Sequence, residues 1–301
     1  LGDETSQRHN VLVSGAVGQG KSNLLMAMVH SLAWQYSPAE LRMYLIDLKE
    51  GLTLHPLAPH PPGQPEFLPQ AAVLGLESDR SFAVAVLQDL VAEFERRASV
   101  IKASGDNISR YRKANPGSAM PRLLVVIDEF HKLFQGDDAS ASVAIDCIEQ
   151  LAREGRAYGI HLVLASQTLS GITALLAKQD GIFSQFPIRL ALKNSSSESR
   201  VVLDQANTEA SRLRFRGEVI INQDFGALEA NRRAVGADAN LGEMAALRRE
   251  LWERDRAAEQ PRVFNGSKPA DLIDAIGDLR ALRVRVQRGS DERLAIVGRE
   301  I

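Results

Sequence analysis

The sequence predicts an α/β fold with a mainly parallel sheet sandwiched between helices, and three observations lead to that prediction. Short apolar runs alternate with longer amphipathic runs from about residue 10 to residue 236. Such alternation is typical of β-α-β units, whose strands pair in parallel and whose helices cover both faces. A glycine-rich loop joins the first apolar run to the first helix, and Asp128 and Glu129 end the most apolar run. Open α/β sheets bind ligands at such strand ends.

The individual elements follow from local patterns. Strands are expected where β-branched and apolar residues form short runs, at 10–15, 41–51, 71–76, 122–128, 159–167 and 187–193. Helices are expected where apolar residues recur at helical spacing, at 21–36, 81–103, 139–158, 169–183 and 195–213. A proline-rich loop is expected at 52–70, a polar loop with a short helix at 106–121, and a hairpin around 224–226.

A change of character near residue 237 predicts a domain boundary. Residues 1–236 carry the alternating pattern, and residues 237–301 are expected to form a small α+β extension that leads toward a further module. Its expected parts are a charged helix at 241–260, a linker at 261–269, a helix at 270–282 and a hairpin at 283–300. The chain opens on Leu1 rather than on methionine, so we expect a piece of a longer protein.

Composition narrows the class of function. The net charge of -2 provides no overall basic field for nucleic acid, so any DNA contact would be local. The single cysteine, Cys147, excludes an internal disulfide and a multi-cysteine zinc site, and we expect it to be a small apolar filler on a helix. No uninterrupted apolar run reaches the roughly 20 residues that span a bilayer. We therefore expect a cytoplasmic chain that meets a membrane only through regions outside it.

The loop after the first strand reads GAVGQGKS and fits the pattern G-x-x-x-x-G-K-[ST]. Its glycines let the backbone curl so that N–H groups point at phosphate oxygens, and the next helix adds its positive dipole end. Lys21 is expected to reach the β- and γ-phosphates, and Ser22 to hold Mg²⁺. The expected phosphate-binding residues are Gly15, Ala16, Val17, Gly18, Gln19, Gly20, Lys21, Ser22 and Asn23. A chance glycine-rich turn is the alternative, and the flanking strand and helix argue against it.

The run LLVVIDEF supplies the expected partner of the phosphate loop. Asp128 lies at the tip of a strand, where a carboxylate can hold Mg²⁺ directly or through water. Glu129 follows, where a second carboxylate can orient and deprotonate the attacking water. Switch proteins that bind GTP usually lack this second carboxylate, so ATP is the expected nucleotide. A solvated acidic turn is the alternative.

Other polar positions leave two interpretations open. Gln167 ends a strand and could contact the γ-phosphate or its water, provided that the phosphate-loop and carboxylate strands are neighbours. A surface glutamine is the alternative. Asp47 and Lys49 end another strand, where a site role and a surface role are equally supported. Arg153 and Arg156 read on spacing alone as solvated helix charges, although in a ring one of them could reach the next subunit's nucleotide.

Five blocks in this order resemble the FtsK/SpoIIIE family of ring-forming motor ATPases. They are HNVLVSGAVGQGKSNLL, LRMYLIDLKEG, LLVVIDEFHKL, LAREGRAYGIHLVLASQ and RLALKNSSSESRVVLD, within a resemblance that covers about residues 9–236. The resemblance implies a RecA-like P-loop ATPase core that works as a hexamer with ATP and Mg²⁺ and translocates double-stranded DNA through a central pore. The EccC/EssC motors of type VII secretion share this core and export proteins, which is the alternative. An ATP-binding assembly platform with weak hydrolysis is a third possibility.

The resemblance also bears on single residues. A family arginine in the helix before the GIHL strand acts across the subunit boundary; Arg156 fits that position, with Arg153 as the fallback. DNA-pumping members often carry Arg-Pro after the glutamine, whereas this chain has Thr168–Leu169. The runs HSLAWQYSPAELRMYLIDLKEG and LASQTLSG look closer to the secretion branch. The SESR run, which contains Arg200, resembles the junction that follows the next strand in the family. The alternative is a capped helix start with a surface arginine.

Two further groups complete the expectations. His131 and His161 are expected to be structural, because no second histidine or cysteine lies at metal-ligand spacing. A basic run could line a DNA path through phosphate contacts, or form a solvated helix face. Its members are Arg96, Arg97, Lys102, Arg110, Arg112 and Lys113.

Overall fold

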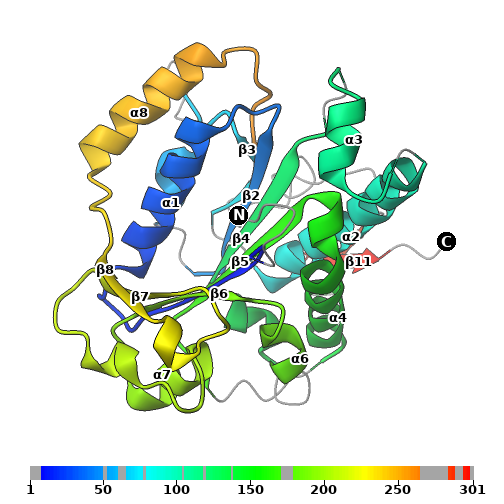
Figure 1. Ribbon diagram of the computed structural model, residues 1–301. Helices are drawn as coiled ribbons and strands as arrows, with labels where there is room; N and C mark the ends of the chain where they lie inside the picture. Colours follow the sequence, from blue (N-terminus) through cyan, green and yellow to red (C-terminus); the bar gives the residue numbers. More distant parts are fainter. Residues whose placement is uncertain are drawn as a thin grey trace.

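The computed structural model describes residues 8–49, 53–59, 66–76, 79–103, 105–117, 120–136, 138–170, 179–264, 284–288 and 294–298. A nine-stranded sheet lies between two layers of helices (Figure 1). The predicted α/β class, with a mainly parallel sheet sandwiched by helices, is confirmed.

The sheet sets the position of every site residue. Its strands are β1 (Val11–Ser14), β2 (Leu41–Asp47), β3 (Ala71–Gly75), β4 (Arg122–Asp128), β5 (Ile160–Ser166), β6 (Ile188–Leu192), β7 (Glu218–Asn222), β8 (Arg232–Val235) and β9 (Arg262–Phe264). Their order is β8-β7-β6-β1-β5-β4-β2-β3-β9, and only β6–β7 and β7–β8 pair antiparallel. The carboxyl ends of β1, β5, β4 and β2 therefore meet at one edge.

Helices cover both faces of this sheet. The α-helices are α1 (Lys21–Gln35), α2 (Arg80–Lys102), α3 (Ile108–Ala114), α4 (Ala139–Glu154), α6 (Gln179–Phe183), α7 (Ser196–Val202) and α8 (Leu241–Arg254). The 3₁₀ turns are η1 (His55–Leu57), η2 (Phe130–Phe134), η3 (Gly155–Tyr158), η4 (Glu209–Arg212) and η5 (Leu228–Ala230). Helices α1 and α8 pack on one face, and α2, α4 and α6 pack on the other (Figure 1).

Strand β4 shows why these sequences form central strands. Leu123, Val125 and Ile127 belong to the core under α2 and α4, whereas Leu124 and Val126 belong to the core under α1. Successive strand side chains point to opposite faces, so a strand that is covered on both faces must be apolar throughout. The continuous apolar run of this segment is the sequence signature of that position.

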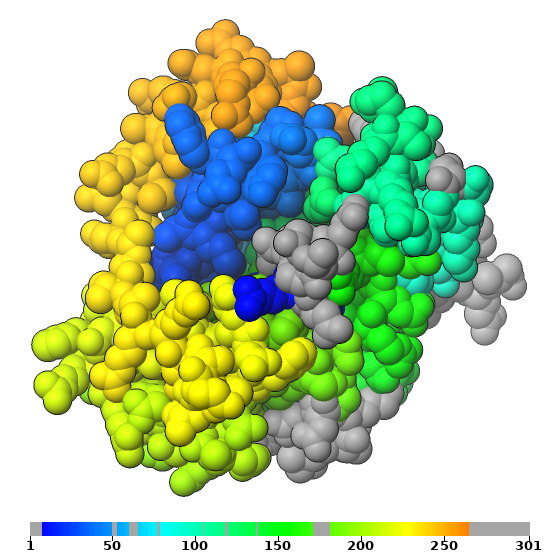
Figure 2. All heavy atoms as spheres, viewed as in Figure 1, coloured from blue at the N-terminus to red at the C-terminus, as the bar shows by residue number. Residues whose placement is uncertain are grey.

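The C-terminal part of the main sheet differs from expectation. The prediction of a linker at 261–269 is wrong for residues 262–264, which form β9. This strand pairs parallel with β3 and extends the sheet. Helix α8 lies along α1, where Arg248 Nη1 and His30 Nε2 are 3.0 Å apart. Figure 2 shows the yellow and orange C-terminal residues beside the blue residues of α1. The domain boundary near residue 237 stays a prediction, but the sheet continues beyond it to Phe264.

Other expected elements are confirmed in part. The helix expected at 195–213 ends at Val202, because Asp204 and Asn207 form a turn in which the Asn207 N–H donates to the Asp204 carbonyl at 2.7 Å. The hairpin expected at 283–300 is confirmed by β10 (Val284–Arg288) and antiparallel β11 (Leu294–Gly298). The helix expected at 270–282, and residues 171–178 of the helix expected at 169–183, lie outside the described residues.

Candidate functional site

The phosphate loop, residues 15–22, connects the carboxyl end of β1 to α1. Gly18 and Gly20 have φ values of 75° and 101°, in the left-handed region that favours glycine. A Cβ atom on Gly15 would lie 2.9 Å from the Cβ of Leu192, so the start of the loop also requires glycine. The backbone thus turns at Gly18 and Gly20, as the motif predicts, and Gly15 is needed because a side chain there would clash.

The amino terminus of α1 has no side-chain cap. Gly20 occupies its N-cap position, whereas α2, α4, α7 and α8 each begin behind a side chain that accepts a hydrogen bond from the first turn. The first N–H groups of a helix have no partner within the helix, and the dipole there favours anions. These donors are therefore arranged for phosphate oxygens.

Lys21 pairs with both carboxylates at the end of β4. Its Nζ contacts Asp128 Oδ1 and lies 2.9 Å from Glu129 Oε1. All three residues are buried. The structure therefore brings together three residues that the sequence predicted for one site from two distant motifs. A phosphate group would compete with these carboxylates for the ammonium.

The backbone of Glu129 explains how two consecutive carboxylates share one cluster. In an extended strand their side chains would point to opposite faces of the sheet. Glu129 instead has φ 54° and ψ 40°, a left-handed conformation that is uncommon for a residue with a side chain. This turn ends β4, begins η2 and brings Glu129 to Lys21 beside Asp128. Such strained conformations concentrate at functional sites.

Burial and charge set the protonation of the pair. Burial raises the pKa of Asp128 by more than the nearby Lys21 lowers it. Burial also acts to raise the pKa of Glu129, but Lys21, the Gln167 N–H and His131 outweigh it and leave that pKa below its usual value. Glu129 is therefore an anion at neutral pH, as an acceptor of a proton from water must be.

Gln167 reaches the site by a different topology from the one expected. The strands of the phosphate loop and the carboxylates, β1 and β4, are not neighbours, because β5 lies between them. Gln167 directly follows β5, and its backbone N–H donates to Glu129 Oε2 at 3.3 Å. The inserted strand thus brings the Gln167 backbone to the Glu129 carboxylate. Contact between its side chain and the γ-phosphate stays a prediction.

His131 is a site residue that sequence reasoning missed. It was expected to be structural, but its Nδ1 lies 2.8 Å from Ser166 Oγ and 3.3 Å from Glu129 Oε2. The contact depends on the left-handed turn at Glu129 and on β5 lying beside β4. Nothing in the local sequence indicates either feature, so no pattern could have found it.

Glu198 is a second missed residue. It is buried at the start of α7 and accepts hydrogen bonds from the backbone N–H groups of Leu169 at 2.8 Å and Ser170 at 3.2 Å. It therefore anchors the loop that follows Gln167. The SESR run was the available signal, but the expectation singled out Arg200, which is exposed.

Asp47 also belongs to this edge of the sheet. It is the register partner of Asp128, it is buried, and its Oδ1 accepts the Lys49 N–H at 2.8 Å. The pKa of Asp47 is raised to about 6, mainly by burial; the Lys49 N–H opposes this shift and the nearby Asp128 adds to it. Of the two equal interpretations for this position, the structure favours a place at the site.

The oxygen atoms at this edge suit Mg²⁺, which prefers oxygen ligands and usually shares them with phosphates and water. They comprise the carboxylates of Asp128 and Asp47 and the hydroxyl of Ser22, whose Oγ accepts from Thr53 Oγ1 at 3.1 Å. The described residues contain no cluster of three or more His, Cys, Asp or Glu arranged for a metal. A metal ion here would therefore also need oxygen atoms from a bound phosphate group or from water.

Two predicted phosphate-loop residues are placed at its margins. Val17 is 74% exposed, at the tip of the loop. The Asn23 side chain bonds to the C-terminal segment: Nδ2 donates to the Ala237 carbonyl and Oδ1 accepts the Ala239 N–H, both at 2.6 Å. Any phosphate contact from Asn23 must therefore come from its backbone.

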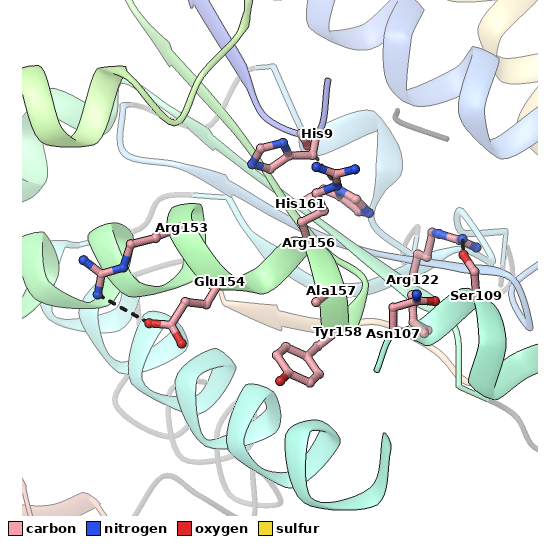
Figure 3. A pocket seen from close by; sticks show the side chains of 11 residues that line it. His9, Asn107, Ser109, Arg122, Arg153, Glu154, Arg156, Ala157, Tyr158 and His161 are labelled. Atoms are coloured by element: carbon pink, nitrogen blue, oxygen red, sulfur yellow. Dashed lines mark hydrogen bonds and ion pairs between the residues drawn. The ribbon is translucent and has the colours of Figure 1, made fainter. Parts of the chain in front are cut away.

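Arg156 lies at the opposite edge of the sheet. It belongs to η3, which precedes the amino end of β5, and it lines a cavity of about 460 Å³ with Arg122, Arg153, His9 and His161 (Figure 3). The seven residues of β5 span roughly 20 Å at about 3.3 Å per residue. Arg156 therefore cannot reach the phosphate loop of its own chain. A role across a subunit boundary stays a prediction.

Three other expectations have clear outcomes. His161 is structural as predicted: it is buried and its Nδ1 donates to the His9 carbonyl at 3.0 Å. Cys147 is buried on α4, also as predicted. The expectation that the basic run lies on an exposed surface is wrong at Arg97, which is buried and donates to Glu93 Oε1 at 2.7 Å. Arg96 pairs with the same carboxylate, so part of the run's charge is neutralised.

No helix in the part of the chain that the structure describes is long and apolar enough to cross a membrane.

Sequence comparison matches the FtsK/SpoIIIE family over residues 2–120 and 112–171, more than half of the chain. The ESX-5 secretion system protein EccC5 of Mycobacterium tuberculosis is 30% identical over 200 residues, which are 64% of this chain and 13% of that protein. The DNA translocase FtsK of Chlorobaculum tepidum is 31% identical over 216 residues, 69% of this chain and 25% of that protein. The chain thus spans a quarter or less of these relatives.

Structure comparison agrees with the fold. The cytoplasmic domain of the type VII secretion ATPase EccC from Thermomonospora curvata superposes with a TM-score of 0.67 and 26% identity, covering 88% of this chain and 30% of that one. The conjugation coupling protein TcpA, solved with ATPγS, superposes with a TM-score of 0.62 and 23% identity, covering 80% of this chain and 66% of that one. The second likeness supports the fold alone.

Proposed function

Because the chain belongs to the FtsK/SpoIIIE family, we propose that it is an ATP-hydrolysing motor domain. The cluster of Lys21, Asp128 and Glu129 at the amino terminus of an uncapped helix is the observation that supports this most directly. It combines a phosphate-binding cation, a carboxylate for a metal and a second carboxylate for water. A domain that only bound nucleotide would not need the strained conformation of Glu129.

Each residue of the cluster has a stated role in this proposal. The phosphate loop and Lys21 bind the β- and γ-phosphates, and Ser22 and Asp128 hold Mg²⁺. Bound Mg²⁺ would neutralise charge on the transferred phosphoryl group. Glu129 orients the attacking water and accepts its proton, and Gln167 senses the γ-phosphate from the adjacent strand.

Two variants test hydrolysis. Lys21→Ala is expected to abolish ATP binding, measured with a fluorescent nucleotide. Glu129→Gln is expected to bind ATP normally but to lose about 10²- to 10⁴-fold in turnover, the usual contribution of a general base. Glu95→Gln, an exposed position on α2, is the matched control and is expected to turn over like the unmodified chain. Normal hydrolysis by Glu129→Gln would overturn the assignment.

We further propose that the domain works as a homo-oligomeric ring, a hexamer like that of its family, in which Arg156 completes a neighbour's site. The separation of Arg156 from its own phosphate loop supports a role between subunits. Mixing Lys21→Ala chains with Arg156→Ala chains tests this. At one kind of interface in a mixed ring, the Arg156→Ala chain supplies an intact Lys21 and the Lys21→Ala chain supplies an intact Arg156. Turnover is expected to rise on mixing, and the rise to grow with protein concentration. Two inactive variants that stay inactive together would contradict the proposal.

For the cargo, the sequence favoured double-stranded DNA and left protein export as the alternative. Within this family we now favour a protein cargo, because Arg97 of the basic run is buried, Arg96 pairs with Glu93, and Arg110 pairs with Asp106. Long double-stranded DNA added to a turnover assay separates the candidates. If turnover does not change at any DNA concentration, the result supports protein export. If turnover rises several-fold with DNA, the result supports a DNA translocase.

A further inference from the structure

His131 connects the general base to the end of β5. Its Nδ1 lies 2.8 Å from Ser166 Oγ and 3.3 Å from Glu129 Oε2. Ser166 is the last residue of β5 and the register partner of Ser14, the residue before the phosphate loop. One imidazole nitrogen thus touches the catalytic carboxylate and the strand that lies between β1 and β4.

The hydrogen bonds around Ser166 determine where the imidazole proton lies. Ser166 Oγ is 2.7 Å from the Thr168 carbonyl, which can only accept, so the hydroxyl proton lies in that bond. Ser166 Oγ also accepts the Thr168 N–H at 3.2 Å. With its one proton committed, Ser166 can only accept from His131. The Nδ1 atom of His131 is therefore the donor to Ser166, and the same nitrogen lies 3.3 Å from Glu129 Oε2.

Glu129 consequently has polar neighbours at both oxygens, a cation at Oε1 and N–H groups beside Oε2. Lys21 pairs with Oε1 at 2.9 Å, while the Gln167 N–H and His131 Nδ1 each lie 3.3 Å from Oε2. In the proposed reaction Lys21 must turn to the phosphates, and Oε1 is then released to face water. The contacts on Oε2 can remain. They would fix the carboxylate while its other oxygen accepts the proton, and near-attack geometry of this kind strongly affects rate.

We propose that His131 is a positioning residue for Glu129: its imidazole is fixed by Ser166 and packs Nδ1 against Oε2. This inference deepens the proposed hydrolysis and rests on it for the effect on rate. His131 does not bind nucleotide in this assignment. It orients the residue that activates water, and it links that residue to the loop that carries Gln167.

Turnover and binding together provide the first test. His131→Ala is expected to lower kcat at least tenfold while KM and fluorescent-nucleotide affinity stay within about twofold, because only the orientation of Glu129 is lost. His131→Asn places an amide N–H near the position of Nδ1 and is expected to recover most of kcat. Gln135→Ala, an exposed residue directly after η2, is the control and should leave kcat unchanged. An unchanged kcat in His131→Ala, or no recovery in His131→Asn, would overturn the proposal.

Histidine NMR tests the arrangement without turnover. The unmodified protein is labelled with ¹⁵N at histidine. The chemical shifts of the His131 ring nitrogens are expected to indicate the Nδ1–H tautomer. The His131 signals are assigned by their loss in His131→Asn. Ser166→Ala removes the acceptor and is expected to shift the tautomer balance toward Nε2–H. A Nε2–H tautomer in the unmodified chain would overturn the proposal even if hydrolysis is confirmed. If the proposed hydrolysis is wrong, Glu129→Gln will turn over ATP normally. That result differs from a wrong His131 tautomer, so the failures of the two proposals are distinguishable.

Discussion

Lys21 Nζ lies 2.9 Å from Glu129 Oε1, so the proposed phosphate-binding cation and the proposed general base are ion partners. The same ammonium contacts Asp128. One cation therefore neutralises both carboxylates at the end of β4. Binding of a phosphate group to Lys21 removes this neutralisation, which would raise the pKa of Glu129 and increase its basicity. In the proposed mechanism, nucleotide binding and activation of the base would thereby be coupled through a single side chain.

Removal of Lys21 should destabilise the chain even without nucleotide. Lys21→Ala leaves two buried carboxylates without a cation, and breaking a buried pair in this way costs about 3–5 kcal/mol. We expect a lower free energy of unfolding for Lys21→Ala in urea at pH 8. The double variant Lys21→Ala/Glu129→Gln should recover part of the loss, because one uncompensated charge is gone. Equal stability of Lys21→Ala and the unmodified chain would show that the pair is not formed in solution.

Asp47 should make stability fall with rising pH. Burial raises its pKa from 3.8 to about 6, so the folded chain prefers the protonated form. The residue costs nothing below its unfolded pKa, and its cost grows as the pH rises through 6. Asp47→Asn keeps the oxygen that accepts the Lys49 N–H, and should be more stable than the unmodified chain at pH 8, by about 3 kcal/mol at most.

Urea unfolding at pH 4 and pH 8, with chelator and without nucleotide, measures this difference. The two chains should be nearly equally stable at pH 4. Asp224→Asn, at an exposed aspartate, controls for general charge effects and should show no pH-dependent gain. A gain for Asp47→Asn that is the same at both pH values would contradict the assigned cause.

His161 should have the opposite pH dependence. Burial lowers its pKa from 6.5 to about 4, so the folded chain holds it neutral. Its contribution is complete above pH 6.5 and is lost as the pH falls toward 4, by about 3 kcal/mol at most. His161→Asn can still donate to the His9 carbonyl but does not titrate. Plotted against pH between 6.5 and 4, the unfolding free energy of this variant should be flatter than that of the unmodified chain; parallel curves would refute the prediction.

Glu198 should control the order of the loop after Gln167. Glu198→Gln removes the charge that accepts the Leu169 and Ser170 N–H groups, and hydrogen bonds to charged groups are worth about 1.5–3 kcal/mol each. We expect faster amide hydrogen exchange at these two residues and a reduced kcat with unchanged ATP affinity. The exposed Glu229→Gln is the control. Unchanged exchange at Leu169 would exclude the anchoring role.

Much of the fold could be predicted because local pattern and tertiary role agree in its core. The all-apolar run of β4 matches a strand covered on both faces, Gly15 marks where β1 ends, and Lys21 marks where α1 begins. Strand β9 could not be predicted in this way. Its three residues, Arg262–Phe264, are too few for a periodicity, and they form a strand only because the edge of β3 is available for pairing.

The site was predictable to the extent that it lies in contiguous motifs. Lys21, Asp128 and Glu129 were found from their own neighbours in sequence. The contacts of His131 and Glu198 depend instead on strand order and on one left-handed residue, and neither property is encoded in a local pattern. The misplaced expectation for Arg97 has the same origin, since its burial depends on acceptance of its guanidinium by Glu93 and by the Tyr158 carbonyl.

The hydrogen bonds between Asn23 and residues 237–239 have a mechanical consequence. Asn23 lies in the first turn of α1, and its side chain is bonded to both Ala237 and Ala239. Helix α8 then follows and packs along α1. A displacement of α8 is therefore transmitted to the end of α1 that follows the phosphate loop. By reciprocity, a ligand that changes the position of that helix end also changes the work needed to displace the C-terminal segment.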